Sequence, residues 1–216
     1  TATGTLSGKT GITIKTAPTG TPSATGAMVF QPASGETTTA KVTRGSTMTA
    51  GSLISVTGST VTTSNIIFDG GNVSASGSVI NVSGTSGVVN VNSGTVFQNN
   101  KATGNNGGAV TVLSGNTVNI SGATFNSNSA GMGGAIYSAG ANVTVADSSF
   151  TGNTVSVAGG AILNMNGTLA VSSSGFFGNS SNNTAYGFGG AVYSTGTFTL
   201  NGGTFTGNTG SKGSAI

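Results

Sequence analysis

Few side chains in this sequence could act as general acids or bases. The chain contains three carboxylates, Glu36, Asp69 and Asp147, and it contains neither histidine nor cysteine. Hydrolysis of a glycosidic bond usually needs two carboxyl groups that flank that bond. A polysaccharide lyase needs a base, often beside a calcium ion held by clustered acids and carbonyls. Whether either chemistry is open to this chain depends on where its fold places the three carboxylates.

A two-part motif repeats along the chain and indicates how these residues are positioned. Each copy consists of Phe-x-x-Asn, a short polar spacer, and Gly-Gly-Ala followed by Ile or Val. The first part occurs at Phe97–Asn100, Phe125–Asn128, Phe150–Asn153, Phe176–Asn179 and Phe205–Asn208, and the second at Gly107–Val110, Gly133–Ile136, Gly159–Ile162 and Gly189–Val192. Successive phenylalanines stand about 25 to 29 residues apart, a period typical of solenoids. A unit of this size cannot bury an apolar face alone, so neighbouring units must stack.

Short segments that alternate apolar and polar residues lie between the motifs. Val89–Val91, Val118–Ile120 and Val143–Val145 show this period of two, which is typical of half-buried strands. No segment shows a helical period, so we predict an all-β, right-handed parallel β-helix of roughly seven turns, with about 26 residues per turn. Residues 1–50 are expected to form an irregular N-terminal turn or capping region. Residues 51–216 are expected to form the repeats, which we expect to continue beyond this sequence.

In such a stack, each repeated position becomes a column along the solenoid axis. Strands pair with their counterparts one turn away, at a spacing of about 4.8 Å. The phenylalanines should form one buried column, and the Ile or Val after each Gly-Gly-Ala should form another. The repeated asparagines suit a turn and are placed to bond one another between turns. The paired glycines suit a corner that needs a positive φ or a close backbone approach.

This predicted spacing disfavours catalysis. Asp69 and Asp147 lie about three repeats apart, which separates them by more than about 10 Å along the axis. Glu36 lies in the poorly repeated start of the chain. A serine nucleophile would also lack a histidine base. We therefore predict that the segment is not an enzyme, that it has no catalytic residue, and that it binds no metal or cofactor.

Charge and hydropathy limit the partners further. The chain has six basic and three acidic residues, a net charge of +3, and only 4% of its residues are charged. A nucleic-acid-binding surface needs a basic patch or stripe. The six basic residues are scattered, so no nucleic-acid partner is expected. No apolar run of about eighteen residues occurs, so the sequence predicts no transmembrane helix.

The alternation of Phe-x-x-Asn with Gly-Gly-Ala resembles the repeat of the chlamydial polymorphic membrane proteins and related repeats of bacterial surface proteins. The resemblance covers about residues 68–216, with five copies of the first part and four of the second. It implies a surface-exposed or secreted passenger domain with a β-helical stalk, an autotransporter-type export route and a role in adhesion. The partner would be a protein or glycan on a host cell or a neighbouring cell.

One candidate binding feature is the spacer Ser180–Phe188, which is longer than the corresponding spacers. Insertions in solenoids emerge as loops, often on the binding face. We expect Asn182, Asn183, Tyr186 and Phe188 to be its contact residues, with the two aromatic side chains as anchors. Alternatively, Phe188 folds back over the corner and caps the core.

A second candidate is the surface row Tyr137, Leu163 and Tyr193, which alternation places outward on consecutive turns. Exposed apolar rows can mark a partner surface. Stacking of side chains between paired strands would also be sufficient reason for such a row.

These patterns together favour a non-catalytic, secreted or cell-surface adhesive stalk of bacterial origin. The main alternative is a structural fibre that self-associates end to end. A carbohydrate-active enzyme and an ice-binding solenoid are less well supported. Ice binding needs outward threonines on every turn, and one outward column reads Asn90, Asn119, Thr144, Ala170 and Thr199.

Overall fold

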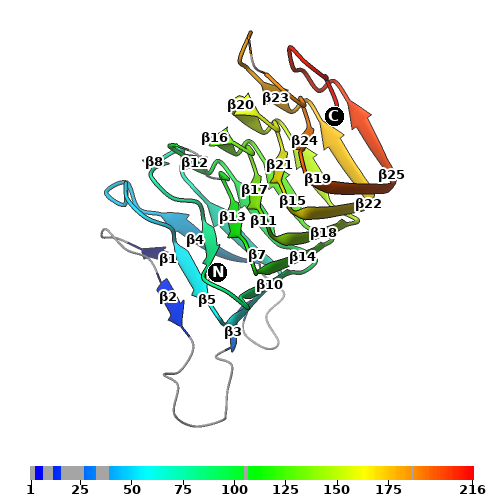
Figure 1. The fold of residues 1–216 in the computed structure, drawn as a ribbon. Helices are drawn as coiled ribbons and strands as arrows, with labels where there is room; N and C mark the ends of the chain where they lie inside the picture. Colours follow the sequence, from blue (N-terminus) through cyan, green and yellow to red (C-terminus); the bar gives the residue numbers. More distant parts are fainter. Residues whose placement is uncertain (1–2, 7–11, 16–26, 33–38, 105–106, 186) are drawn as a thin grey trace.

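The computed structural model describes residues 3–6, 12–15, 27–32, 39–104, 107–185 and 187–216. Within these ranges the chain forms strands and turns but no helix, and each paired strand runs parallel to its partner. Figure 1 shows the strands stacked along one axis from the N-terminal to the C-terminal end. The predicted all-β parallel solenoid is therefore confirmed, with roughly 26 residues per turn. It has about six turns, slightly fewer than the predicted seven.

The largest sheet contains thirteen strands arranged in two ladders. The first ladder runs through β1 (Thr3–Leu6), β4 (Ala40–Arg44), β7 (Ile66–Asp69), β11 (Val96–Gln98), β15 (Thr124–Asn126), β19 (Ser149–Thr151), β22 (Thr168–Phe177) and β25 (Thr197–Thr206). The second runs through β3 (Ala27–Phe30), β6 (Thr60–Thr63), β10 (Val88–Val91), β14 (Thr117–Ser121) and β18 (Asn142–Ala146) to the same β22. The two ladders merge because β22 and β25 are each ten residues long and extend across both.

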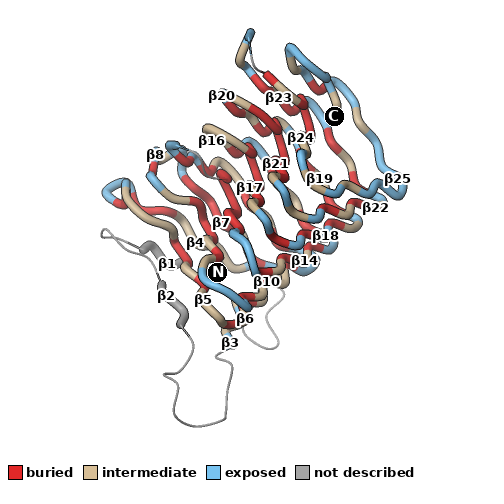
Figure 2. The backbone as a smooth tube through the Cα atoms, viewed as in Figure 1, coloured by how far each residue is buried: buried red, intermediate tan, exposed pale blue. Residues whose placement is uncertain are grey.

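Two smaller sheets complete each turn. The seven-stranded sheet consists of β2 (Ile12–Lys15), β5 (Ile54–Thr57), β9 (Ile80–Ser83), β13 (Val110–Leu113), β17 (Ile136–Ala139), β21 (Ile162–Met165) and β24 (Val192–Ser194). The five-stranded sheet consists of β8 (Ser74–Ala75), β12 (Lys101–Ala102), β16 (Ser129–Met132), β20 (Thr154–Ala158) and β23 (Ser180–Ser181). Figure 2 shows buried residues alternating with more exposed ones along the strands. This pattern is expected when alternate side chains of each strand point into the solenoid and form its core.

The core contains the two predicted columns. The ring centroids of successive phenylalanines lie 4.6 to 5.2 Å apart from Phe68 to Phe205. The first five of these rings are at most 1% exposed. The second column is equally regular and fully paired between strands: Ile54, Ile80, Val110, Ile136, Ile162 and Val192. The strand register therefore follows the sequence repeat.

The repeated asparagines form a buried hydrogen-bonded ladder, as predicted. The side-chain amide of Asn128 donates to Oδ1 of Asn153 at 3.0 Å and to the carbonyl of Phe97 at 3.0 Å. The backbone N–H of Asn128 donates to the same Oδ1. The ladder begins at Asn100, whose Oδ1 has no partner among the described residues, because the preceding corner at 70–73 is built differently and supplies no equivalent amide. Each further turn adds an asparagine that satisfies the one before it.

The double glycines form corners that admit no side chain. Gly133, Gly159 and Gly189 have φ values of 60°, 68° and 56°, in the region that favours glycine. A Cβ on Gly134 would collide with the carbonyl oxygen of Gly160 one turn away. The corners of successive turns thus approach backbone to backbone, which explains the paired glycines.

Candidate functional site

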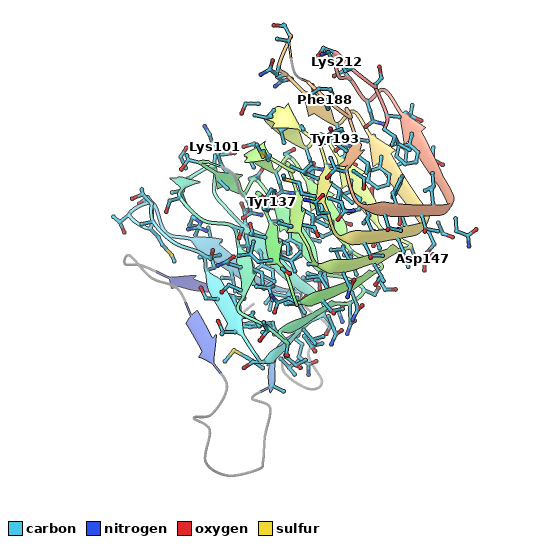
Figure 3. All side chains as sticks on the ribbon, in the orientation of Figure 1. Lys101, Tyr137, Asp147, Phe188, Tyr193 and Lys212 are labelled. Carbon is cyan, nitrogen blue, oxygen red and sulfur yellow. The ribbon has the colours of Figure 1, made fainter. Side chains whose placement is uncertain are left out.

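Asp69 and Asp147, the two candidate carboxylates that the structure describes, lie on different turns and do not form a site together. Asp69 forms an ion pair with Lys41, with 2.7 Å between Oδ2 and Nζ, and it accepts hydrogen bonds from the Gly71 N–H and the Gln98 side chain. Burial raises the pKa of the Asp69 carboxyl, but these partners outweigh that effect and lower its pKa to about 2. Asp147 occupies a turn with φ 49° at the opposite edge of the molecule from Lys101 (Figure 3). Glu36 lies outside the described residues.

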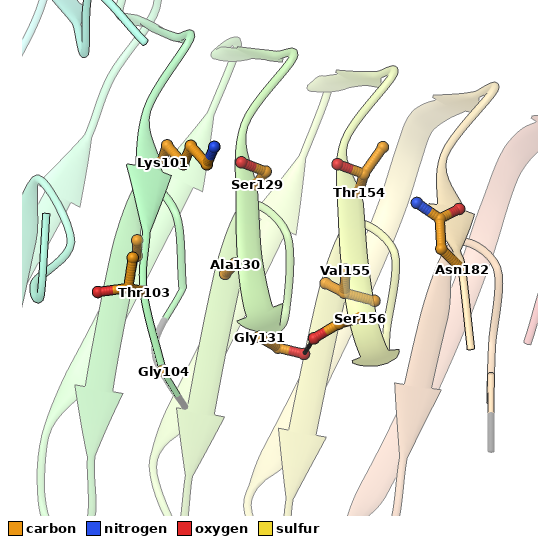
Figure 4. Close-up of a pocket in the computed structure, with 11 residues that line it drawn as sticks. Lys101, Thr103, Gly104, Ser129, Ala130, Gly131, Thr154, Val155, Ser156 and Asn182 are labelled. Atoms are coloured by element: carbon orange, nitrogen blue, oxygen red, sulfur yellow. Dashed lines mark hydrogen bonds between the residues drawn. The ribbon is translucent and has the colours of Figure 1, made fainter. Parts of the chain in front are cut away.

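A groove lies on the five-stranded sheet. It has a volume of about 470 Å³, within the range typical of ligand sites. We call it the axial groove because it crosses β12, β16 and β20 in turn and so runs along the solenoid axis (Figure 4). Its lining comprises Lys101, Ala102, Thr103, Gly104, Ser129, Ala130, Gly131, Thr154, Val155, Ser156 and Asn182.

Small side chains on the short strands create this groove. Ala102, Ala130 and Val155 form its middle row, and Ala102 and Val155 are at most 4% exposed, so the backbone of this row forms the floor of the groove. Ser129 and Thr154 are paired in register on one side of that row. The register shifts after Ala130, because β20 has one more residue than β16 before the next pair, Met132 and Ala158. This irregularity ends the regular pairing along one side of the groove.

Beyond Asn182, a second hollow of about 250 Å³ continues toward the C-terminal end. Its lining includes Asn182 and Asn183 of the predicted binding loop, together with Ser180 and Thr209. The Ser180 hydroxyl donates to Oδ1 of Asn182 at 2.6 Å and accepts from the Thr209 hydroxyl at 2.9 Å. Because the axial groove and this hollow share Asn182, the two form one continuous surface over successive turns.

The electrostatics of the axial groove are set by one residue. Lys101 is the only charged residue that lines it, and this exposed side chain forms no ion pair within the described part of the chain. The other polar groups that line the groove are uncharged hydroxyls and the Asn182 amide. In the close-up, the Lys101 side chain extends toward β16 at the N-terminal end of the groove (Figure 4). The arrangement can offer hydrogen bonds along its length and one positive charge at its end.

Only part of the predicted binding loop, Ser180–Phe188, is exposed to solvent. Asn182 is exposed and Asn183 is half-buried, whereas Tyr186 lies outside the described residues. The expectation that Phe188 projects as an anchor is wrong. Its ring stacks on Tyr193 at 5.1 Å and lies under the Lys212 ammonium, and its backbone bridges Ala158 (Figure 3). Phe188 folds back as the alternative proposed, but it packs on the outside of the sheet and is not part of the apolar core.

The predicted surface row is interrupted at its centre. Tyr137, Leu163 and Tyr193 are indeed paired in register on β17, β21 and β24. The two tyrosines are half-buried, but Leu163 is only 2% exposed, so the prediction that all three residues are exposed is wrong. Leu163 has a tyrosine on each side, and the corner at Gly159 lies close against its backbone. This row is therefore mainly a packing feature.

Sequence reasoning overlooked most of the axial groove. A signal for it exists, because each Phe-x-x-Asn is followed by a short segment with a small or β-branched residue between polar or glycine neighbours. These segments are Lys101–Thr103, Ser129–Gly131, Thr154–Ser156 and Ser180–Asn182. Because side chains alternate along a strand, the central residue of each segment lies in the middle row of the groove, and the residues before and after it line the two sides.

Comparison with known families agrees with the repeat found in the sequence. Residues 122–139 and 147–165 match the model of the Chlamydia polymorphic membrane protein repeat. No curated protein and no solved structure matches the chain. The chain thus contains repeats of the polymorphic membrane protein type, which confirms the resemblance seen in its motifs. Such repeats on a parallel β-solenoid fit the passenger domain of a bacterial surface autotransporter.

Proposed function

We propose that this chain is a non-catalytic adhesive passenger domain, secreted or displayed on the bacterial surface, that binds partners through the axial groove. The groove itself carries the proposal. It is a concave surface with one cation and several hydroxyl groups that crosses consecutive turns of the stack, on a chain whose repeats are of a surface-protein type. Binding sites are commonly concave, with a few polar groups that fix the orientation of the ligand.

The state of Asp69 argues against its use as a general acid. A carboxyl with a pKa of about 2 is ionised at neutral pH and cannot donate a proton as a general acid. Its oxygens are also occupied by Lys41, Gly71 and Gln98. No cluster of three or more potential metal-binding acids occurs among the described residues. No helix in the described ranges is long and apolar enough to cross a membrane.

Attachment of the purified chain to immobilised cell-surface extract, measured by surface plasmon resonance, tests this proposal. We expect saturable binding, no turnover of polysaccharides, and a monomeric sedimentation coefficient at the concentrations used. Filaments that grow with concentration, together with no binding to the extract, would contradict the proposal and favour the fibre. Hydrolysis or elimination of a polysaccharide would contradict it in favour of an enzyme.

A further inference from the structure

We propose that the axial groove binds an extended oligosaccharide of neutral sugars that ends in one carboxylated sugar, with the carboxylate at Lys101. This inference rests on the proposed function, because it names the partner class for the same groove. It follows from the direction of the groove, from the chemistry of its lining and from the position of its one charge.

The shape of the groove suits a narrow, extended chain. Successive turns repeat at about 4.8 Å, which is on the order of the length of one sugar ring in an extended glycan. Ser129 and Thr154 stand one turn apart on one side of the groove, and Asn182 lies at its far end. A ligand chain that lies along the axis would meet a new hydroxyl or amide at each turn.

The lining favours a glycan over a peptide. Peptides often bind by adding a strand to a free sheet edge, but here the backbone groups are already paired between turns. The Ser129 N–H donates to the Asn100 carbonyl at 2.8 Å, and the Thr154 N–H donates to the Asn128 carbonyl at 2.9 Å. Among the described residues, no aromatic side chain lines the groove to receive a large apolar side chain. Hydroxyl and amide groups both donate and accept hydrogen bonds, as sugar hydroxyls do.

The charge of the groove favours a single acidic sugar. Lys101 lies at the N-terminal end and is the one cation in the lining. A densely sulfated or carboxylated polymer would lose hydration at each of its charges and would find a counter-charge for only one. In a glycan with one terminal carboxylate, that carboxylate would contact Lys101. The neutral sugars would contact the uncharged hydroxyls of the groove.

Titration calorimetry with two matched probes tests this inference: sialylated lacto-N-tetraose, which carries one carboxylate, and its neutral parent lacto-N-tetraose. The purified chain should bind the sialylated probe about tenfold more tightly. Lys101→Met should remove that difference by weakening the sialylated probe much more than the neutral parent, whereas Lys101→Arg should retain most of it. Thr154→Trp, which fills the groove, should weaken the binding of both probes.

Three outcomes would overturn the inference. The first is an equal loss for both probes in Lys101→Met, and the second is tighter binding of a heparin oligosaccharide than of the sialylated probe. The third is the absence of binding by any of these glycans while Thr154→Trp still abolishes attachment to cell-surface extract. That third result would leave the proposed adhesive groove intact and reject only its glycan ligand.

Discussion

The rings of Phe125 and Phe150 stack with their centroids 4.6 Å apart and their planes within 1° of parallel. The two residues are paired in register on β15 and β19, and both are fully buried. The separation of the rings is close to the spacing of paired strands, about 4.8 Å. The backbone ladder therefore sets the ring stack, and each interior phenylalanine has an aromatic neighbour on both sides.

Phe150→Ala should lower the free energy of unfolding by roughly 3–5 kcal/mol, because it opens a cavity in a column that the backbone ladder prevents from collapsing. Phe177→Ala is the matched control, since that ring is 38% exposed. Its cost should stay below about 1 kcal/mol. Urea denaturation followed by circular dichroism measures both, and similar losses for the two variants would refute the core ladder.

Asn153→Ala should destabilise the chain by about 3 kcal/mol or more, because several buried groups lose their partners. Oδ1 of Asn153 accepts from both the backbone and the side chain of Asn128, and its amide donates to Oδ1 of Asn179. Asn142→Ala should have little effect, because Asn142 is an exposed residue of β18. A melting temperature for Asn153→Ala equal to that of Asn142→Ala would show that the ladder contributes no stability.

Gly134→Ala should be strongly destabilising, since the new Cβ would collide with the Gly160 carbonyl and the corner cannot move without disturbing the next turn. Ser138→Ala in the same turn should be neutral or stabilising. The Ser138 hydroxyl is buried without a hydrogen-bond partner among the described residues, so its removal relieves a desolvation cost. Thermal melts compare the two variants. A stable Gly134→Ala would contradict the corner geometry.

Stability should fall as the pH drops from about 4 to about 2, partly because Asp69 becomes protonated. Its folded-state pKa of about 2 lies below the unfolded value of about 3.9. The stabilisation is therefore complete above the unfolded pKa and is lost as the pH falls through the folded pKa. Asp69→Asn should flatten this part of the stability profile. Parallel profiles for wild type and Asp69→Asn would count against the ion pair with Lys41.

The positions of the inward-facing residues were predictable because the sequence repeat is strict at these positions. Phenylalanine, asparagine and paired glycine each occupy a site where only that kind of residue satisfies packing, hydrogen bonding or backbone clearance. The outward half was less predictable, because exposure depends on how corners and loops fold over a strand. Period-2 alternation placed Leu163 outward correctly but could not show that it would be covered.

Isolated interactions outside the repeated motifs were also beyond the sequence pattern. Arg44 is one of the six basic residues scattered along the sequence, and it is only 4% exposed. Its guanidinium donates to the carbonyls of Gly51 and Ser78, each at 3.1 Å, and so ties one turn to the next. The axial groove likewise depends on register between spacers whose sequences differ, and such register becomes visible only in three dimensions.

The most direct test of the adhesive groove compares two tryptophan variants of one solenoid turn. Thr154→Trp fills the axial groove, whereas Thr144→Trp places the same side chain on the exposed face of β18. Attachment of each purified variant to cell-surface extract is measured after equal melting temperatures have been verified. We expect Thr154→Trp to lose attachment at least tenfold and Thr144→Trp to match the wild type. Full attachment by a folded Thr154→Trp variant would contradict the account.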